Sequence, residues 1–219
     1  MGKYDTVLFD LDGTLTDSAP GITACVQKAL DHFGLHYEQK DLTVFVGPPL
    51  RKMFPRFGVS QADVEEAVAV FRQNYEDWGK YENAPYDGIE ALLSHLSSAG
   101  IQLGVATSKP EHLAVEILNR FDLSKYFALI AGASLDGSRD TKTEVLRYAL
   151  QQMKYQHCVL VGDTVYDACG AKELGIDAVG VSWGFGDLKQ MKEAGMRIIV
   201  DTPVQLEKIL LDSYTENRQ

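Results

Sequence analysis

The chain has 219 residues, of which 45% are hydrophobic and 24% are charged, a balance that is ordinary for a globular protein. The formal net charge of -10 argues against a nucleic acid polymer or an anionic membrane surface as a partner. No run approaches the roughly 20 apolar residues of a membrane span, and the 3 cysteines form no CxxC pair, which favours a reduced, cytoplasmic setting.

Short apolar runs recur along the chain and alternate with amphipathic helical patterns. The predicted strands are Thr6–Phe9, Leu103–Ala106, Ala128–Ile130, Cys158–Val161, Ala178–Val181 and Arg197–Val200. Most of these runs are continuously apolar, which is typical of strands that are covered on both faces. The alternation of strand and helix predicts an α/β fold with a Rossmann-like, mostly parallel sheet.

The segment of residues 17–84 breaks this alternation, because its apolar residues repeat only at helical spacing and no strand is predicted in it. Two helical stripes stand out: Ile22, Cys25, Val26, Ala29, Leu30 and Phe33, then Val64, Ala67, Val68, Phe71, Tyr75 and Trp78. We therefore predict an α/β core of residues 1–16 and 85–212, an all-helical cap of residues 17–84, and a polar tail of residues 213–219.

Polar residues follow the predicted strands at the edge where the carboxyl ends of a parallel sheet meet. They are Asp10, Asp12, Thr107, Ser108, Lys109, Lys142, Asp163 and Asp167. Oxygen ligands without cysteine or histidine suit a hard cation such as Mg²⁺, and hydroxyls with backbone N–H groups at a helix start suit a phosphate. A carboxylate beside a lysine can act as a nucleophile, and a second carboxylate nearby can transfer protons.

Each of these residues, taken alone, also has a purely structural interpretation. The sequence DLDGT is typical of a strand that ends in a turn, and SKPE would make Ser108 the N-cap of a helix with Glu111 at its third position. Asp163 could be an N-cap, and Lys142 could be a solvated lysine. The functional interpretation is favoured because four strand ends each supply a group that phosphoryl transfer requires.

The motifs DLDGT, ATSKP, Lys142 and GDTVYD, in this order and spacing, resemble the four motifs of haloacid dehalogenase-like phosphatases. The insertion after the first motif looks like the helical cap of the subfamily that includes phosphoglycolate phosphatase and β-phosphoglucomutase. The stretches DSAPGI, GPPL and SLDGSRDTK look most similar to members described as phosphoglycolate phosphatase-like or 5′-nucleotidase-like. The dehalogenases lack the second acidic residue of the first motif, so Asp12 argues against dehalogenation.

The resemblance implies a role for each matching residue. Asp10 would be the nucleophile and a Mg²⁺ ligand, and Asp12 would be the general acid and base, with its backbone carbonyl also on the metal. Lys142 would offset the charge of Asp10 and the phosphate. Asp163 would be a further metal ligand, and Asp167 would lie close by, with its contact to the metal through a water.

The remaining implied contacts concern the phosphate and the rest of the substrate. Thr107 and the backbone N–H of Ser108 would hold the transferring phosphoryl group. In the cap, Arg51 and Lys52 could bind a substrate carboxylate or phosphate, or they could be solvated charges. The turn containing Arg139 could approach the site, and the loop WGFG could line its rim, although packing is the default for its tryptophan.

Together these features predict a Mg²⁺-dependent phosphatase that hydrolyses small phosphate monoesters, phosphoglycolate-like or nucleoside monophosphate, through an aspartyl-phosphate. A phosphomutase of the β-phosphoglucomutase type is an alternative, because the core motifs are shared. A non-hydrolytic phosphoacceptor or interaction protein is an alternative of another class. The expected partner is a small-molecule phosphate ester, with no nucleic acid or membrane, and the chain is expected to be a monomer or a homodimer.

Overall fold

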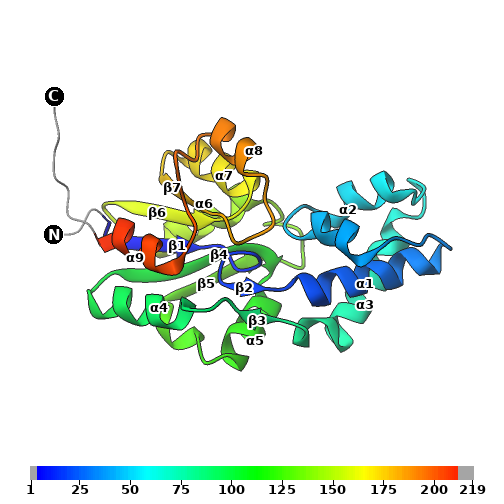
Figure 1. The fold of residues 1–219 in the computed structure, drawn as a ribbon, viewed down its shortest axis with the longest axis horizontal. Coiled ribbons are helices and arrows are strands. Elements are labelled where there is room, and N and C mark those ends of the chain that lie inside the picture. The colour runs from blue at the N-terminus through cyan, green and yellow to red at the C-terminus, as the bar shows by residue number, and fades with distance from the viewer. Residues whose placement is uncertain (1–3, 212–219) are drawn as a thin grey trace. The chain divides into compact units, whose positions relative to one another are not determined.

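The computed structural model describes residues 4–211 and contains a six-stranded parallel sheet (Figure 1). Its strands run in the order β5-β4-β1-β6-β7-β8. Their bounds are Thr6–Phe9 for β1, Gln102–Pro110 for β4, Leu129–Ala133 for β5, Cys158–Gly162 for β6, Asp177–Val181 for β7 and Ile198–Val200 for β8. All six predicted strands are present, and the predicted Rossmann-like α/β fold is confirmed. The predicted tail of residues 213–219 lies outside the described residues.

Helices cover both faces of this sheet (Figure 1). One face packs against α4 (Ile89–Ser98), α5 (Glu111–Arg120) and α9 (Pro203–Leu211), with a short 3₁₀ turn at Ser124–Tyr126. The other face packs against α6 (Lys142–Gln152) and α7 (Val165–Leu174), and α8 (Leu188–Ala194) lies beside α7.

Strand β1 shows why the sheet needs cover on both faces. Val7 and Phe9 belong to the first apolar cluster, whereas Leu8 belongs to the second. Successive side chains of a strand point to opposite faces, so an unbroken apolar run fills both layers. Because β1 lies between β4 and β6, the chain order reverses beside it, and such a switch point is where open α/β sheets bind ligands.

The chain divides into two compact units, which we describe separately. The α/β unit combines the described residues up to Leu15 with those from Pro85 onward, and the helical unit is Thr16–Ala84. The helical unit contains α1 (Ala19–His32), α2 (Leu50–Met53) and α3 (Val64–Asp77), with 3₁₀ helices at Gln39–Phe45, Phe54–Phe57 and Gly79–Tyr81. Helices α1 and α3 pack together, and most residues of the two predicted apolar stripes are buried.

Two very short strands, β2 (Thr16–Asp17) and β3 (Ala84–Pro85), pair with each other. Neither of these strands is predicted from the sequence. A strand of two residues shows no alternation of apolar and polar positions, which is the signal that a strand prediction needs. Within residues 4–211, no helix combines the length and the apolar character that crossing a bilayer requires.

Candidate active site

Asp10 follows β1 directly and is held in place by the strands around it. Its N–H donates to the carbonyl of Val161 at 2.8 Å, which extends the ladder between β1 and β6 by one bond. Its Oδ1 accepts the N–H of Leu11 at 2.8 Å and lies 2.7 Å from Nζ of Lys142. One oxygen of the carboxylate is therefore anchored twice.

Lys142 is the first residue of α6, and its side chain is buried rather than solvated. Besides contacting Asp10, its Nζ donates to the carbonyl of Ala106 at 3.0 Å and lies 2.8 Å from Oδ1 of Asp167. A capping box fixes the start of the helix, because Thr141 Oγ1 accepts the N–H of Glu144 while the Glu144 carboxylate accepts the N–H of Thr141. The local sequence T-K-T-E therefore sets the lysine at the strand ends.

Asp163 and Asp167 follow β6 and have different hydrogen-bond partners. Asp163 accepts the Thr14 hydroxyl on Oδ1 at 3.1 Å and the N–H of Phe185 on Oδ2 at 2.8 Å. Asp167 uses Oδ2 to cap α7, accepting the N–H of Thr164 at 3.0 Å and its hydroxyl at 2.7 Å. Since Oδ1 of Asp167 contacts Lys142, both of its oxygens are already engaged.

Three buried carboxylates, those of Asp10, Asp163 and Asp167, have ligand atoms within 4.8 Å of one another. Burial raises the pKa of Asp10 to about 6 although Lys142 opposes the shift. Burial, together with the charges of Asp167 and Asp10, raises the pKa of Asp163 to about 8. Burial disfavours the charged form of Lys142, but Asp10 and Asp167 outweigh it and raise its pKa.

This charge balance fits a divalent cation. One ammonium group does not neutralise three buried carboxylates, so further positive charge would stabilise the ionised site. All the possible metal-ligand atoms in the cluster are carboxylate oxygens. Oxygen ligands suit Mg²⁺ better than a metal that prefers thiolate or imidazole ligands. The cluster could thus hold a divalent cation, and its geometry agrees with the expected convergence of Asp10, Lys142, Asp163 and Asp167.

Gly13 lets the loop after β1 pass close to Asp163. Its φ of +83° lies in the left-handed region, and a Cβ at this position would lie 2.2 Å from Oδ2 of Asp163. Only glycine meets both requirements without strain. The DLDGT sequence is therefore a turn, as its structural interpretation holds, and this turn brings Gly13 and Thr14 beside Asp163 at the end of β6.

Asp12 lies in the same turn but pairs with a second lysine. Nζ of Lys109 donates to both of its carboxylate oxygens, at 2.9 and 3.1 Å, and the Lys109 side chain is buried. The sequence predicts Lys109 at this edge but assigns it no role. The sequence indicates only that both residues follow predicted strands and so lie at the same sheet edge; it does not indicate that they pair.

The last residues of β4, after Ala106, differ from the prediction at Ser108. We expected Ser108 to cap a helix, but α5 begins at Glu111 with Pro110 as its N-cap, and no side chain caps it. The capping prediction is wrong because a residue that precedes proline is driven out of the helical region, so β4 continues through a shift in register instead. Thr107 is buried, and its hydroxyl accepts the N–H of Lys109 at 3.2 Å.

Arg139 makes contacts that brace the start of α5, directly after β4. Its Nη2 lies 2.7 Å from Oε2 of Glu111, its Nε donates to the carbonyl of Gly132 at 3.2 Å, and its guanidinium stacks 3.9 Å from the centre of the Tyr148 ring. Glu111 also accepts the N–H of Gly132 at 3.2 Å. Arg139 thereby ties the start of α5 to the end of β5 and to α6.

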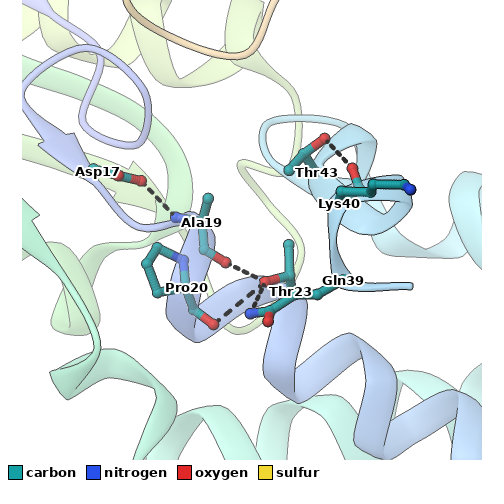
Figure 2. Close-up of a pocket in the computed structure, with 7 residues that line it drawn as sticks. All are labelled: Asp17, Ala19, Pro20, Thr23, Gln39, Lys40 and Thr43. Carbon is teal, nitrogen blue, oxygen red and sulfur yellow. Dashed lines mark hydrogen bonds between the residues drawn. The ribbon is translucent and has the colours of Figure 1, made fainter. Parts of the chain in front are cut away.

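The helical unit has a pocket of about 300 Å³ (Figure 2). Its lining residues are Asp17, Ala19, Pro20, Thr23, Gln39, Lys40 and Thr43. Figure 2 shows that several of their polar groups bond to one another, for instance the Gln39 amide to the Thr23 hydroxyl at 2.9 Å. The two cap cations singled out from the sequence, Arg51 and Lys52, do not line this pocket. Arg51 makes two hydrogen bonds to Glu65, at 2.6 and 2.8 Å.

Comparison with known proteins gives consistent matches. A family model described as haloacid dehalogenase-like hydrolase matches residues 7–181. The tyrosine-protein kinase PtkA of Mycobacterium tuberculosis is 45% identical over 82% of this chain, which spans only 62% of that relative's length. A 5′-nucleotidase of Pseudomonas aeruginosa is 40% identical over 87% of this chain and 88% of its own. The crystal structure of a predicted phosphatase from Clostridium acetobutylicum superposes with a TM-score of 0.89 and 42% identity, covering 94% of this chain and 97% of its own.

Proposed function

The chain belongs to the haloacid dehalogenase-like hydrolases, and on that premise we propose that it is a Mg²⁺-dependent phosphatase of small phosphate monoesters. The observation that carries the proposal is the buried contact of Asp10 with Lys142, beside the carboxylates of Asp163 and Asp167. A nucleophilic carboxylate needs a neighbouring cation and a fixed orientation, and this arrangement supplies both.

Asp10 is the attacking group in the proposed reaction. With Oδ1 anchored by Leu11 and Lys142, Oδ2 attacks the phosphorus atom, an aspartyl-phosphate forms, and the bond from phosphorus to the ester oxygen breaks. Asp12 gives the leaving oxygen its proton and later takes a proton from the water that attacks the same phosphorus. That second step releases phosphate and restores the Asp10 carboxylate.

The other residues of the site bind and balance charge. Thr107 and the N–H of Ser108 hold the phosphoryl group, and Lys142 offsets its negative charge. Asp10, Asp163 and the backbone carbonyl of Asp12 would hold the divalent cation, with Asp167 behind them. That cation would supply electrostatic stabilisation of the phosphoryl oxygens.

The substrate class within this proposal is a phosphoglycolate-like ester or a nucleoside monophosphate. The similarity to a 5′-nucleotidase over most of both chains supports the second. Arg51 and Lys52 remain the proposed contacts for the part of the substrate that leaves. The proposal includes a cytoplasmic location and a monomer or homodimer as the active form.

The test is phosphate release from a panel of esters, with Mg²⁺ and with EDTA, for the wild type and Asp10→Asn. The panel contains phosphoglycolate, nucleoside monophosphates, hexose phosphates and pyrophosphate, and Asp41→Asn is the matched control because Asp41 is exposed in the helical unit. We expect release that requires Mg²⁺, loss of it in Asp10→Asn, and wild-type rates in Asp41→Asn. Full activity of Asp10→Asn would refute the mechanism.

The relative named a tyrosine-protein kinase favours one second candidate, transfer of the phosphoryl group to an acceptor other than water. In the absence of that acceptor, such a protein would keep the phosphoryl group on Asp10 for minutes without releasing phosphate. A phosphomutase would instead convert β-glucose 1-phosphate to glucose 6-phosphate. Product analysis in the same panel separates these outcomes from hydrolysis.

A further inference from the structure

The four residues Trp183–Gly186, here called the WGFG loop, are fixed at both ends. Just before the loop, the N–H of Ser182 donates to the carbonyl of Val200 at 3.0 Å, and the Ser182 hydroxyl donates to Asp201 at 2.6 Å. Just after it, the Asp187 carboxylate caps α8 by accepting two backbone N–H groups. The loop therefore joins two well-anchored elements and has a defined course between them.

The WGFG loop supplies a backbone donor to Asp163. The N–H of Phe185 donates to Oδ2 at 2.8 Å, while the Thr14 hydroxyl donates to Oδ1 at 3.1 Å. Asp163 is 1% exposed, so no bulk water competes for these oxygens. Two donors from two separate loops fix the rotation of this carboxylate within its cluster with Asp10 and Asp167.

Trp183 supports the contact between Thr14 and Asp163. Its indole N–H donates to the carbonyl of Thr14 at 3.1 Å, so it holds the same residue whose hydroxyl holds Asp163. The ring also packs edge-on against Tyr86, with the ring centres 6.4 Å apart. Trp183 thus links the WGFG loop to the turn that carries Asp10 and Asp12.

The two glycines of the loop leave no room for a side chain beside Asp163. A Cβ on Gly184 would lie 2.3 Å from Oδ2 of Asp163 and 2.4 Å from the carbonyl oxygen of Gly13. A Cβ on Gly186 would lie 1.9 Å from the carbonyl oxygen of Asp163. Either substitution would push Asp163 or its backbone out of position.

From these contacts we infer that the WGFG loop is a positioning element for Asp163, which sets the affinity of the carboxylate cluster for a divalent cation. The inference rests on the proposed function, because it concerns the cation site of that reaction. The loop touches none of the reacting groups in this account, and it acts only by fixing the carboxylate and the turn after β1. Groups that orient a metal ligand from behind commonly matter almost as much as the ligand.

The experiment measures Mn²⁺ binding to the intact, substrate-free protein by electron paramagnetic resonance. Mn²⁺ is a suitable probe because it also prefers carboxylate and carbonyl oxygens. Gly184→Ala should weaken binding by about 10-fold or more, the range seen when the partners of metal ligands are removed. Trp183→Phe keeps a ring beside Tyr86 but removes the indole N–H, so we expect a smaller weakening, of several-fold.

Matched controls separate positioning from general loss of stability. Trp78→Phe changes the other tryptophan, which lies in the helical unit. Gly34→Ala introduces a side chain at a φ of +70° with open space around it, so it should lower the melting temperature through backbone strain. Both controls should bind Mn²⁺ as the wild type does.

The outcomes distinguish the two proposals from each other. Wild-type Mn²⁺ affinity in both loop variants would overturn the positioning role while leaving the cation site intact. A wild type that binds no Mn²⁺ would overturn the positioning role and also the metal requirement of the proposed function. If Gly184→Ala does not fold, Trp183→Phe decides the question alone.

Discussion

The two units of the chain differ in whether their charged side chains are buried or exposed. Within residues 4–211, the buried charged side chains all belong to the α/β unit: Asp10, Lys109, Lys142, Asp163 and Asp167. The helical unit has charged pairs such as Arg51 with Glu65 and Lys40 with Glu38, and these lie at the surface. Its buried side chains are apolar or uncharged.

This difference indicates where the chemistry resides. A buried charge is costly unless it is paired, so a cluster of five at one sheet edge persists because the fold supplies partners from several strand ends. Exposed pairs contribute little to stability because water screens them. Substitutions should therefore have large effects in the α/β cluster and small effects on the helical unit's charges.

The largest effect is expected for Lys142→Met, which leaves Asp10 and Asp167 without their shared cation. Activity should fall by about three orders of magnitude because the nucleophile loses its orientation and charge partner. Removing one partner of a buried pair typically lowers the free energy of unfolding by about 3–5 kcal/mol. Urea unfolding in EDTA measures this, with the exposed Lys40→Met as the control. Equal unfolding midpoints for Lys142→Met and the wild type would show that the buried pair is not important for stability.

A strong pH dependence is expected for the metal-free protein. The pKa values of Asp10 and Asp163 are raised to about 6 and about 8 in the folded protein. In the unfolded chain, an aspartate has a pKa of about 4. The folded chain thus binds more protons over this range, so the stability from these groups is complete below about pH 4. This stability is lost as the pH rises through the folded-state pKa values of Asp10 and Asp163.

Melting temperatures measured across this range in EDTA and in Mg²⁺ check the prediction. In EDTA the melting temperature should fall with rising pH, and Mg²⁺ should reduce or reverse the fall because it binds the ionised carboxylates. Asp163→Asn should flatten the part of the curve near its folded pKa. A melting temperature in EDTA that rises with pH over the whole range would contradict the raised pKa values of Asp10 and Asp163.

An intermediate effect is expected for the brace between Arg139 and Glu111. Arg139→Met removes a partly buried ion pair and a bond to the Gly132 carbonyl, which should lower the free energy of unfolding by about 1–2 kcal/mol. A double-mutant cycle with Glu111→Gln should show a coupling of about 1 kcal/mol, since the two groups are in direct contact. Strictly additive effects would mean that the pair contributes nothing.

The smallest effect is expected for Arg51→Met in the helical unit. Arg51 and Glu65 have side chains that are 46% and 70% exposed, so the free energy of unfolding should change by less than about 1 kcal/mol. If Arg51 contacts substrate, as proposed, KM should rise while kcat stays constant. Steady-state kinetics on the preferred ester measures both, and an unchanged KM would remove Arg51 from the substrate contacts.

The sequence predicted the sheet and the convergence of the carboxylates because those features have strong signals. Unbroken apolar runs identify β1 and β6, and polar residues directly after them must meet at one edge. The start of α5 was missed because the capping pattern around Ser108 outweighed the restriction that Pro110 places on the preceding residue. The Lys109–Asp12 pair joins residues 97 positions apart, and no local pattern predicts such a partner.

The contacts of the WGFG loop show a second limit of sequence reasoning. The donor to Asp163 is the backbone N–H of Phe185, and every residue except proline has such a group. The side chain of Phe185 therefore gives no indication that its backbone N–H binds Asp163. Gly184 and Gly186 were visible signals, because glycine often marks a close approach of backbone to another group, but the sequence does not say which group approaches.

The most direct test of the central claim is to trap the phosphoryl group on Asp10. A single turnover of the fastest ester in the panel, labelled with ³²P, is quenched in acid within its first phase in the presence of Mg²⁺. We expect label on the wild-type protein that hydroxylamine releases, as is typical of an acyl phosphate, and no label on Asp10→Asn. Label that passes to inorganic phosphate without ever appearing on the wild-type protein would contradict the proposed aspartyl-phosphate mechanism.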